Sequence, residues 1–164
     1  MPKRIDQLAS EVVVIQTPFS KLALEFESGL LVSIDLFSRK KLSSAKSDEV
    51  RYGAQQVKDY CAKQLPDFVF DIALDARGTL FQKKVWQALQ KIPAGEVMTY
   101  GELAKQLNTS ARAVGNACRA NPIPLVIPCH RVVSKSGMGG FAGSRDGLPM
   151  KIKSWLLAHE NLPV

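Results

Sequence analysis

The sequence predicts an α+β protein built from two parts. A small α/β domain with an antiparallel sheet is expected over residues 1–76, and a mostly helical domain with a helix-turn-helix over residues 77–164. Apolar residues alternate in the first part, as in half-buried strands, but recur every three or four residues in the second. The chain carries a net charge of +7, with 10 Lys and Arg against 11 Asp and Glu up to Asp75, and 12 against 4 from Ala76 onward. A basic excess confined to one half favours a polyanionic partner such as nucleic acid.

The composition excludes several classes of protein. With 164 residues, 46% of them hydrophobic, the chain is long enough to bury a core without disulfides. No apolar run approaches the roughly 20 residues of a membrane span, and residues 1–6 do not resemble a secretory signal, so we expect a cytoplasmic protein with no membrane partner. Cys61, Cys118 and Cys129 lack CxxC spacing, and His130 and His159 are the only histidines, which predicts free thiols and no metal site.

The first part is expected to begin as a three-stranded meander. Residues 11–15 are mostly β-branched, and Ser28-Gly29 supplies a tight turn between the next two strands. The inward positions of those strands are predicted to be Leu22, Leu24 and Phe26, followed by Leu30, Val32, Ile34 and Leu36. A polar loop over 39–49 then leads into a helix over 50–61 that ends before Pro66. Alternation at Phe68, Phe70, Ile72 and Leu74 predicts one more strand.

The second part is expected to be helical. Thr79 with Gln82 and Thr99 with Glu102 have the form of capping boxes, each opening a helix. The first of these helices is predicted to bury a stripe and to end at Pro93; the stripe consists of Phe81, Val85, Leu89 and Ile92. The second helix, a turn at 108–110 and a third helix over 111–120 have helix-turn-helix spacing.

The third helix carries small residues, namely Ala111, Ala113, Gly115 and Ala117. Major-groove readers usually project long polar side chains, whereas this helix offers Arg112, Asn116 and Arg119 among small neighbours. That pattern fits a close approach to the minor groove of DNA. Tight packing inside the domain is the other interpretation.

The last quarter contains the residue most suited to chemistry. The apolar run 125–127 leads into Pro128-Cys129-His130-Arg131, which predicts a cysteine at a strand end. A thiolate is a good nucleophile, and His130 is a candidate base that Glu160 could orient. A buried structural cysteine beside a hydrogen-bonded histidine is the alternative. A glycine-rich loop (139–143) and a final helix with Ile152, Trp155, Leu156 and His159 on one face follow. Three lysines of this region, Lys135, Lys151 and Lys153, are expected to be solvated surface charges.

The motifs together resemble the O6-alkylguanine-DNA alkyltransferases, also called methylated-DNA–protein-cysteine methyltransferases. The resemblance is first evident in the segment PCHRV (128–132), and it is not confined to that segment. Further blocks occur in the family's order and near its spacing: FQKKVW (81–86), GEVMTY (95–100), ARAVG (111–115), NP (121–122) and WLLAHE (155–160). The first half resembles the family only in size and in its strand–helix pattern.

The resemblance implies a ribonuclease H-like α/β domain followed by a winged-helix-like domain. It implies direct-reversal DNA repair, in which the Cys129 thiolate irreversibly takes the alkyl (methyl) group from O6-alkylguanine in double-stranded DNA. Each molecule would act once, as a monomer and without a cofactor. The sequence leaves open whether O4-alkylthymine is a further substrate. The target base would be flipped out through the minor groove, because O6 in a stacked duplex is out of reach.

The resemblance also implies roles for individual residues. Cys129 matches the alkyl acceptor, His130 the residue that takes its proton through water, and Glu160 the carboxylate that orients His130. Asn121 matches an asparagine that braces the turn around the acceptor. Tyr100 matches a tyrosine that rotates the target phosphate, and Arg112 an arginine that fills the hole left by the flipped base. Further DNA contacts are expected from Ala111, Gly115, Asn116, Arg119 and Arg131, and pocket contacts from Val132, Phe141, Ala142 and Gly143.

The glycine-rich loop departs from the family pattern. Phe141 stands where the family commonly has a tyrosine, and the stretch 137–141 is one residue short. Phe141 can stack on a base but cannot donate a hydrogen bond, so main-chain donors near Ala142 and Gly143 would have to assist the leaving guanine.

Three other functions are weighed. A non-catalytic protein that binds alkylated bases and flags them for another pathway would lack the acceptor, whereas Cys129 is present. A transcription regulator with Cys129 as a sensor predicts a dimerisation segment, which the sequence does not show. A thiol hydrolase acting on small molecules does not explain Arg112 or the charge asymmetry.

Overall fold

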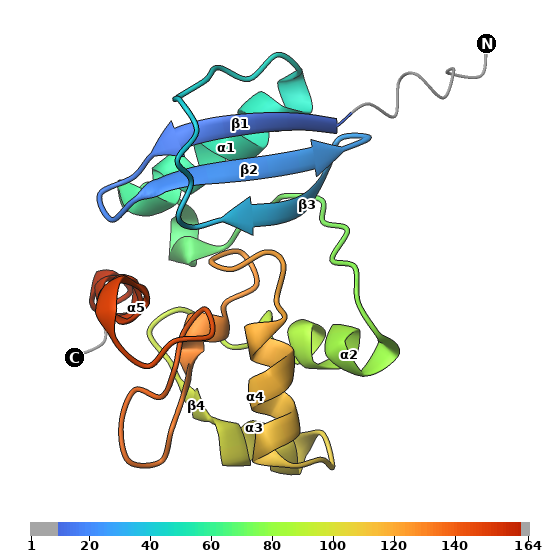
Figure 1. Ribbon diagram of the computed structural model, residues 1–164, viewed down its shortest axis with the longest axis vertical. Coiled ribbons are helices and arrows are strands. Elements are labelled where there is room, and N and C mark those ends of the chain that lie inside the picture. Colours follow the sequence, from blue (N-terminus) through green and yellow to red (C-terminus); the bar gives the residue numbers. More distant parts are fainter. Residues whose placement is uncertain (1–9, 162–164) are drawn as a thin grey trace. The chain divides into compact units, whose positions relative to one another are not determined.

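The computed structural model describes residues 10–161, and these divide into two compact units, 10–77 and 78–161 (Figure 1). Each unit is described by itself. The expected N-terminal segment 1–6 lies outside the described residues. Within residues 10–161, no helix combines the length and the apolar character needed to cross a membrane.

The first unit is built on a three-stranded antiparallel sheet. Its strands, β1 (Ser10–Gln16), β2 (Lys21–Glu27) and β3 (Leu30–Asp35), lie in sequence order, which confirms the predicted meander. Ser28 (φ 53°) and Gly29 (φ 81°) form the turn between β2 and β3. The predicted inward residues of β2, Leu22, Leu24 and Phe26, are buried.

A β-bulge changes the inward face of β3. Glu25 pairs with Ser33 but Phe26 pairs with Leu31, so Val32 is an extra residue in the ladder. Leu31 is therefore fully buried and Leu30, predicted to face inward, is 37% exposed. Strict alternation could not reveal this bulge, because one inserted residue turns the side chains of the residues before it to the opposite face of the sheet.

Helix α1 (Asp48–Cys61) covers one face of this sheet (Figure 1). Its buried residues include Val50, Ala54 and Val57, as the periodicity predicted. The helix approaches the sheet closely at Gly53, where a Cβ would lie 2.7 Å from Phe26 Cζ.

The predicted strand at residues 68–74 is wrong. Phe68 ends a short 3₁₀ helix, Pro66–Phe68, and the following chain forms only an isolated bridge between Leu74 and Leu31. The side chain of Gln56 takes the place of a neighbouring strand: it donates to Asp71 O at 2.8 Å and accepts from Asp71 N at 2.6 Å. The alternating aromatics instead pack on Tyr60, whose ring lies 5.3 Å from that of Phe68.

The second unit begins with three capped helices. They are α2 (Leu80–Leu89), α3 (Tyr100–Gln106) and α4 (Ala111–Arg119). Both predicted capping boxes, at Thr79 and Thr99, are present. Ser110 caps α4 by accepting from Ala113 N at 3.1 Å, so α3, the turn and α4 have the predicted helix-turn-helix spacing. Trp86 ties α2 to α4 by donating to Ala117 O at 2.8 Å.

Two details of α2 differ from the prediction. The helix ends at Leu89 rather than at Pro93, and Phe81, expected in the buried stripe, is 37% exposed. Val85, Leu89 and Ile92 are buried as predicted, although Ile92 lies in the turn that follows the helix.

The unit closes with a small parallel pairing and a last helix. Strand β4 (Met98–Thr99) pairs with β5 (Val132–Val133), and α5 (Gly147–His159) follows the glycine-rich loop. Ile152 and Leu156 of α5 are buried as predicted, while Trp155 and His159 stack on each other with ring centroids 4.3 Å apart.

Candidate functional site

The Cys129 thiol lies in a turn rather than at a strand end, which corrects the prediction. Residues Cys129–Arg131 form one turn of 3₁₀ helix, and strand β5 begins only afterwards. Pro128 supplies the bend: Cys129 N donates to Ile127 O at 2.8 Å and Arg131 N to Pro128 O at 3.0 Å. The turn lets successive side chains point in different directions without the strict alternation of a strand.

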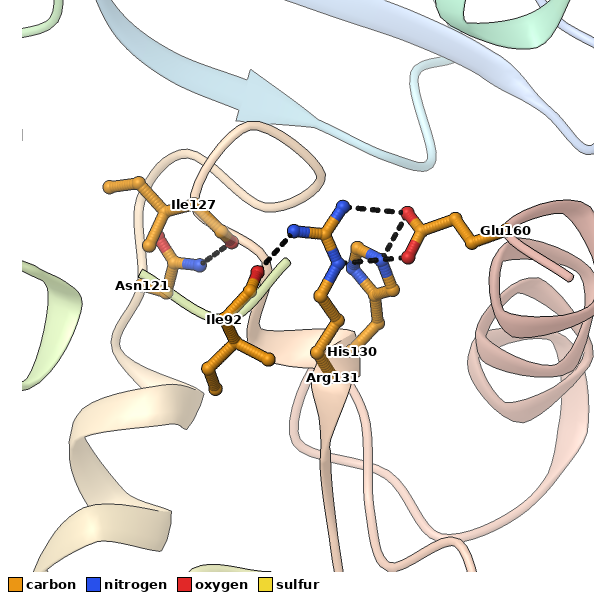
Figure 2. A network of polar contacts seen from close by, with 6 residues as sticks. All are labelled: Ile92, Asn121, Ile127, His130, Arg131 and Glu160. Carbon is orange, nitrogen blue, oxygen red and sulfur yellow. Dashed lines mark hydrogen bonds and ion pairs between the residues drawn. The ribbon is translucent and has the colours of Figure 1, made fainter. Parts of the chain in front are cut away.

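Asn121 braces the chain that leads into this turn. Its Nδ2 donates to Ile127 O at 2.9 Å (Figure 2). Its Oδ1 accepts from Ile123 N at 3.0 Å. The same side chain opposes the rise that burial causes in the pKa of the Cys129 thiol. Asn121 therefore holds the loop that precedes Cys129, and its role in the reaction stays a prediction.

His130, Arg131 and Glu160 form a buried polar network (Figure 2). His130 Nε2 lies 2.9 Å from Glu160 Oε2, while Arg131 donates from Nε to Oε1 at 2.8 Å and from Nη2 to Oε2 at 3.0 Å. Arg131 Nη1 also donates to Ile92 O at 2.7 Å. Because a carboxylate only accepts, it fixes the His130 proton on Nε2 and leaves Nδ1 as the basic nitrogen. That Nδ1 is buried and has no hydrogen-bond partner among the described residues.

The network sets the charge of its members. Burial opposes ionisation of Glu160, but His130 and Arg131 outweigh it and lower the pKa of this carboxyl to about 2. Burial lowers the pKa of His130 despite the neighbouring carboxylate, so the imidazole is neutral at pH 7. Burial raises the pKa of the Cys129 thiol, while the Asn121 hydrogen bond and the Lys153 charge oppose the rise. A buried thiol with a neutral imidazole base next in sequence suits nucleophilic chemistry.

Two cationic side chains, Arg131 and Lys153, have surroundings that differ from those predicted. Arg131, which was predicted to contact DNA, has a buried side chain that is paired with Glu160. Lys153, expected to be solvated, is fully buried on α5 and donates to three main-chain carbonyls. A signal was available: Lys153 lies on the same helical stripe as the buried Ile152, Leu156 and Leu157.

Helix α4 presents one exposed stripe. Arg112, Asn116 and Arg119 are exposed on it, Ala111 is exposed at its start and Gly115 is half-buried between them. These positions repeat every three or four residues and therefore share a face. A Cβ at Gly115 would meet nothing within 4 Å, so internal packing does not require a glycine there. Ala111 and Gly115 thus leave an open surface beside the exposed arginines, which favours the groove-approach interpretation at Gly115, whereas Ala117 is packed inside the unit.

The remaining predicted site residues lie in β5, in the glycine-rich loop and at the start of α3. Val132 and Phe141 are buried, whereas Ala142 and Gly143 are exposed in a tight turn that Phe141 and Ser144 close with hydrogen bonds of 2.8 and 2.9 Å. Tyr100 Oη makes a long hydrogen bond, 3.5 Å, to Gly140 O, and burial raises the pKa of this phenol to about 12.

The other two cysteines differ from Cys129 in their surroundings. Cys61 lies in the first unit and Cys118 on α4, and burial raises their pKa values to about 11 and about 12. Neither adjoins a histidine in the sequence. Across residues 10–161, no three His, Cys, Asp or Glu side chains gather closely enough to hold a metal ion.

Comparisons with known proteins agree on one family. Residues 80–162 match the model described as "6-O-methylguanine DNA methyltransferase, DNA binding domain". The chain is 50% identical over 95 residues to the methylated-DNA–protein-cysteine methyltransferase of Mycolicibacterium paratuberculosis, a match covering 56% of each chain. It is 39% identical over 121 residues to the probable methyltransferase of that name from Acanthamoeba polyphaga mimivirus, covering 73% of this chain and 77% of the viral one. The chain thus spans little more than half the length of the mycobacterial relative.

Solved structures give the same result over more of the chain. The crystal structure of Mycobacterium tuberculosis O6-methylguanine methyltransferase is 34% identical with a TM-score of 0.77, covering 93% of both chains. The same organism's protein in complex with DNA is 35% identical with a TM-score of 0.74, covering 93% of this chain and 95% of that one. These matches confirm the mixed α/β architecture with a small antiparallel sheet.

Proposed function

Because the chain belongs to the 6-O-methylguanine DNA methyltransferase family, we propose that it repairs alkylated DNA by moving the alkyl group of O6-alkylguanine onto Cys129. The observation that carries this proposal is the setting of the Cys129 thiol. The thiol is buried, Asn121 opposes the rise of its pKa, and the next residue is a histidine whose Nε2 lies at hydrogen-bond distance from a buried carboxylate.

The proton path begins at this thiol. Glu160 holds the proton of His130 on Nε2, so Nδ1 accepts the thiol proton through a bridging water. Arg131 keeps the Glu160 carboxylate charged and in place, which stabilises the imidazolium that forms. Asn121 and Lys153 favour the thiolate, since both oppose the rise in pKa that burial causes.

The transfer itself is a displacement at the alkyl carbon. A bond forms between Cys129 Sγ and this carbon as the bond from carbon to O6 breaks, and the electron pair stays on the guanine. The guanine takes up one proton at N1, which balances the proton lost by the thiol. The products are a thioether and an unmodified guanine. No step breaks the thioether, so each molecule acts once.

DNA binding is proposed for the exposed stripe of α4, formed by Ala111, Arg112, Gly115, Asn116 and Arg119. The small residues allow a close approach to the minor groove, and Arg112 is long enough to enter the base stack. Tyr100 turns the phosphate of the target nucleotide outward. Flipping the base costs a few kcal/mol, and less for a weakened pair. Val132, Phe141, Ala142 and Gly143 then receive the base.

Further features of the proposal rest on the family. The first unit is a ribonuclease H-like structural domain, and the second unit is a winged-helix-like domain that holds the DNA and the acceptor. The protein acts as a monomer in the cytoplasm, without a cofactor, and accepts O4-alkylthymine as a second substrate. The non-catalytic, damage-flagging alternative is not favoured, because Cys129 is present and the similar proteins reported above are named as methyltransferases.

A repair assay with a blocked restriction site tests this function. A duplex whose recognition site contains one O6-methylguanine becomes cleavable only after the methyl group is removed. We expect cleavable DNA to plateau at one duplex per protein molecule, with none for Cys129→Ser and a wild-type plateau for the control Cys118→Ser. Continued turnover, or repair by Cys129→Ser, would contradict the proposal.

A further inference from the structure

Lys153 is a buried cation that the proposed transfer uses only through its charge. Its side chain is fully buried in the middle of α5. The ammonium donates to Val132 O at 2.7 Å, Met138 O at 2.5 Å and Gly140 O at 2.9 Å. An ammonium has three N–H donors, and each has an acceptor here.

The burial of this group is costly. Its three acceptors are carbonyls, so no carboxylate among them offsets the charge, and burial lowers the pKa of Lys153 to about 8. A surface lysine of the same helix would avoid this cost. Lys151, two residues earlier, is exposed.

The three carbonyls belong to two stretches: one lies in strand β5, and the other two lie just before and inside the glycine-rich loop. Val132 lies in strand β5, directly after the Cys129–Arg131 turn, whereas Met138 and Gly140 directly precede Phe141. One ammonium therefore joins the strand that follows the acceptor to the loop that carries a candidate pocket residue.

The same loop contacts Tyr100. Gly140 O accepts from Tyr100 Oη as well as from Lys153. Gly139 has a φ of +73°, and a Cβ there would lie 2.9 Å from Tyr100 Cε2. The loop main chain thus lies directly against the Tyr100 ring, and its position determines where both aromatic side chains, Tyr100 and Phe141, can lie.

We propose that Lys153 is a positioning residue for alkyl transfer: its ammonium holds the glycine-rich loop in the form that receives the base beside Cys129. This inference rests on the proposed function. It predicts that removing the Lys153 ammonium both makes the loop less ordered and weakens binding of the base.

The test compares Lys153→Met, which keeps the length of the side chain but removes the ammonium, with Lys151→Met as the matched control. Amide hydrogen exchange reports the order of residues 133–144. The rate of Cys129 benzylation against the concentration of free O6-benzylguanine separates binding of the base from the maximal rate. Urea unfolding reports global stability.

For Lys153→Met we expect exchange in residues 133–144 about tenfold faster, with α2 and α4 unchanged. The half-saturating concentration of O6-benzylguanine should rise about tenfold, more than the maximal rate falls. Lys151→Met should match wild type in both. If Lys153→Met also matches wild type in either measurement, the inference is overturned.

A second variant covers the case in which Lys153→Met does not fold. Lys153→Arg keeps a cation with several donors. If amide exchange in the loop of this variant matches wild type, its half-saturating concentration of O6-benzylguanine should match wild type as well. A folded Lys153→Arg in which one measurement changes and the other does not would overturn the inference. If wild type repairs no O6-methylguanine in the blocked-site assay, the proposed function fails, while the exchange data still report whether Lys153 holds the loop.

Discussion

The carboxylate of Glu160 accepts three hydrogen bonds from two side chains. His130 Nε2 lies at 2.9 Å, and Arg131 Nε and Nη2 at 2.8 and 3.0 Å, with all three side chains buried. Glu160→Gln keeps the size of the side chain but replaces one acceptor oxygen with an NH₂ group. Arg131 then carries a buried charge without a counterion, and at least one N–H faces another donor.

The size of the effect follows from two arguments. Removing one partner of a buried ion pair costs about 3–5 kcal/mol. The lowering of the Glu160 pKa from 4.5 to about 2 corresponds to about 3 kcal/mol of stabilisation of the folded state. We therefore expect Glu160→Gln to lower the free energy of unfolding by about 3 kcal/mol at pH 7.

Urea unfolding followed by tryptophan fluorescence measures this change. Trp86 and Trp155 are the only tryptophans and both lie in the second unit, so the signal reports the unit that contains Glu160. The control is Glu102→Gln, at an exposed capping-box position where glutamine can accept the same hydrogen bond from Thr99 N.

The pH dependence adds a second check on Glu160. Its folded-state pKa is depressed, so its contribution is complete above pH 4.5 and is lost as the pH falls toward 2. Wild type should lose more stability than Glu160→Gln over this range. A Glu160→Gln variant within about 0.5 kcal/mol of wild type at pH 7 would refute the reasoning.

Four further predictions concern the site and α4. Gly115→Ala should stabilise the second unit by about 0.8 kcal/mol in urea unfolding, because a Cβ there meets nothing within 4 Å, yet should weaken duplex binding in a titration; unchanged DNA affinity would count against a close approach. Arg112→Ala should slow repair of duplex DNA by about tenfold while reaction with free O6-benzylguanine is unchanged; equal losses would exclude its role in the base stack. Phe141→Tyr should accelerate alkyl transfer if a missing hydroxyl limits it, and an unchanged rate would show that other donors suffice. Because burial lowers the pKa of His130, the transfer rate should keep its neutral-pH value down to below pH 6.5; a midpoint at or above 6.5 would argue against a buried neutral base.

Local patterns predicted most of the regular structure. The meander, α1 and the capping boxes at Thr79 and Thr99 follow from signals within a few residues, so the sequence contains them directly. The stretch 68–74 has equally clear alternation but is not a strand. Its main chain pairs with the Gln56 side chain, a partner that lies 15 residues away and that alternation does not reveal.

The sequence predicted which residues lie at the candidate site better than it predicted which of their side chains are buried. His130 lies 2.9 Å from Glu160, and Asn121 holds the loop that leads to Cys129. The roles of these residues in alkyl transfer stay predictions. The environments of Arg131 and Lys153 were predicted wrongly, because each cation is buried by acceptors distant in the sequence. Arg131 is held by Glu160 and Ile92 O, 29 and 39 residues away. A charged residue type predicts exposure only when no such partner exists.

Peptide mass spectrometry after mixing the protein with duplex DNA that contains one O6-methylguanine tests the central claim most directly. The account predicts a gain of one methyl group per protein, located on Cys129 and absent from Cys61 and Cys118. Cys129→Ala should gain none, and Asn121→Ala should gain it more slowly. A protein that binds the lesion but gains no methyl group, or gains it on another cysteine, would contradict the account.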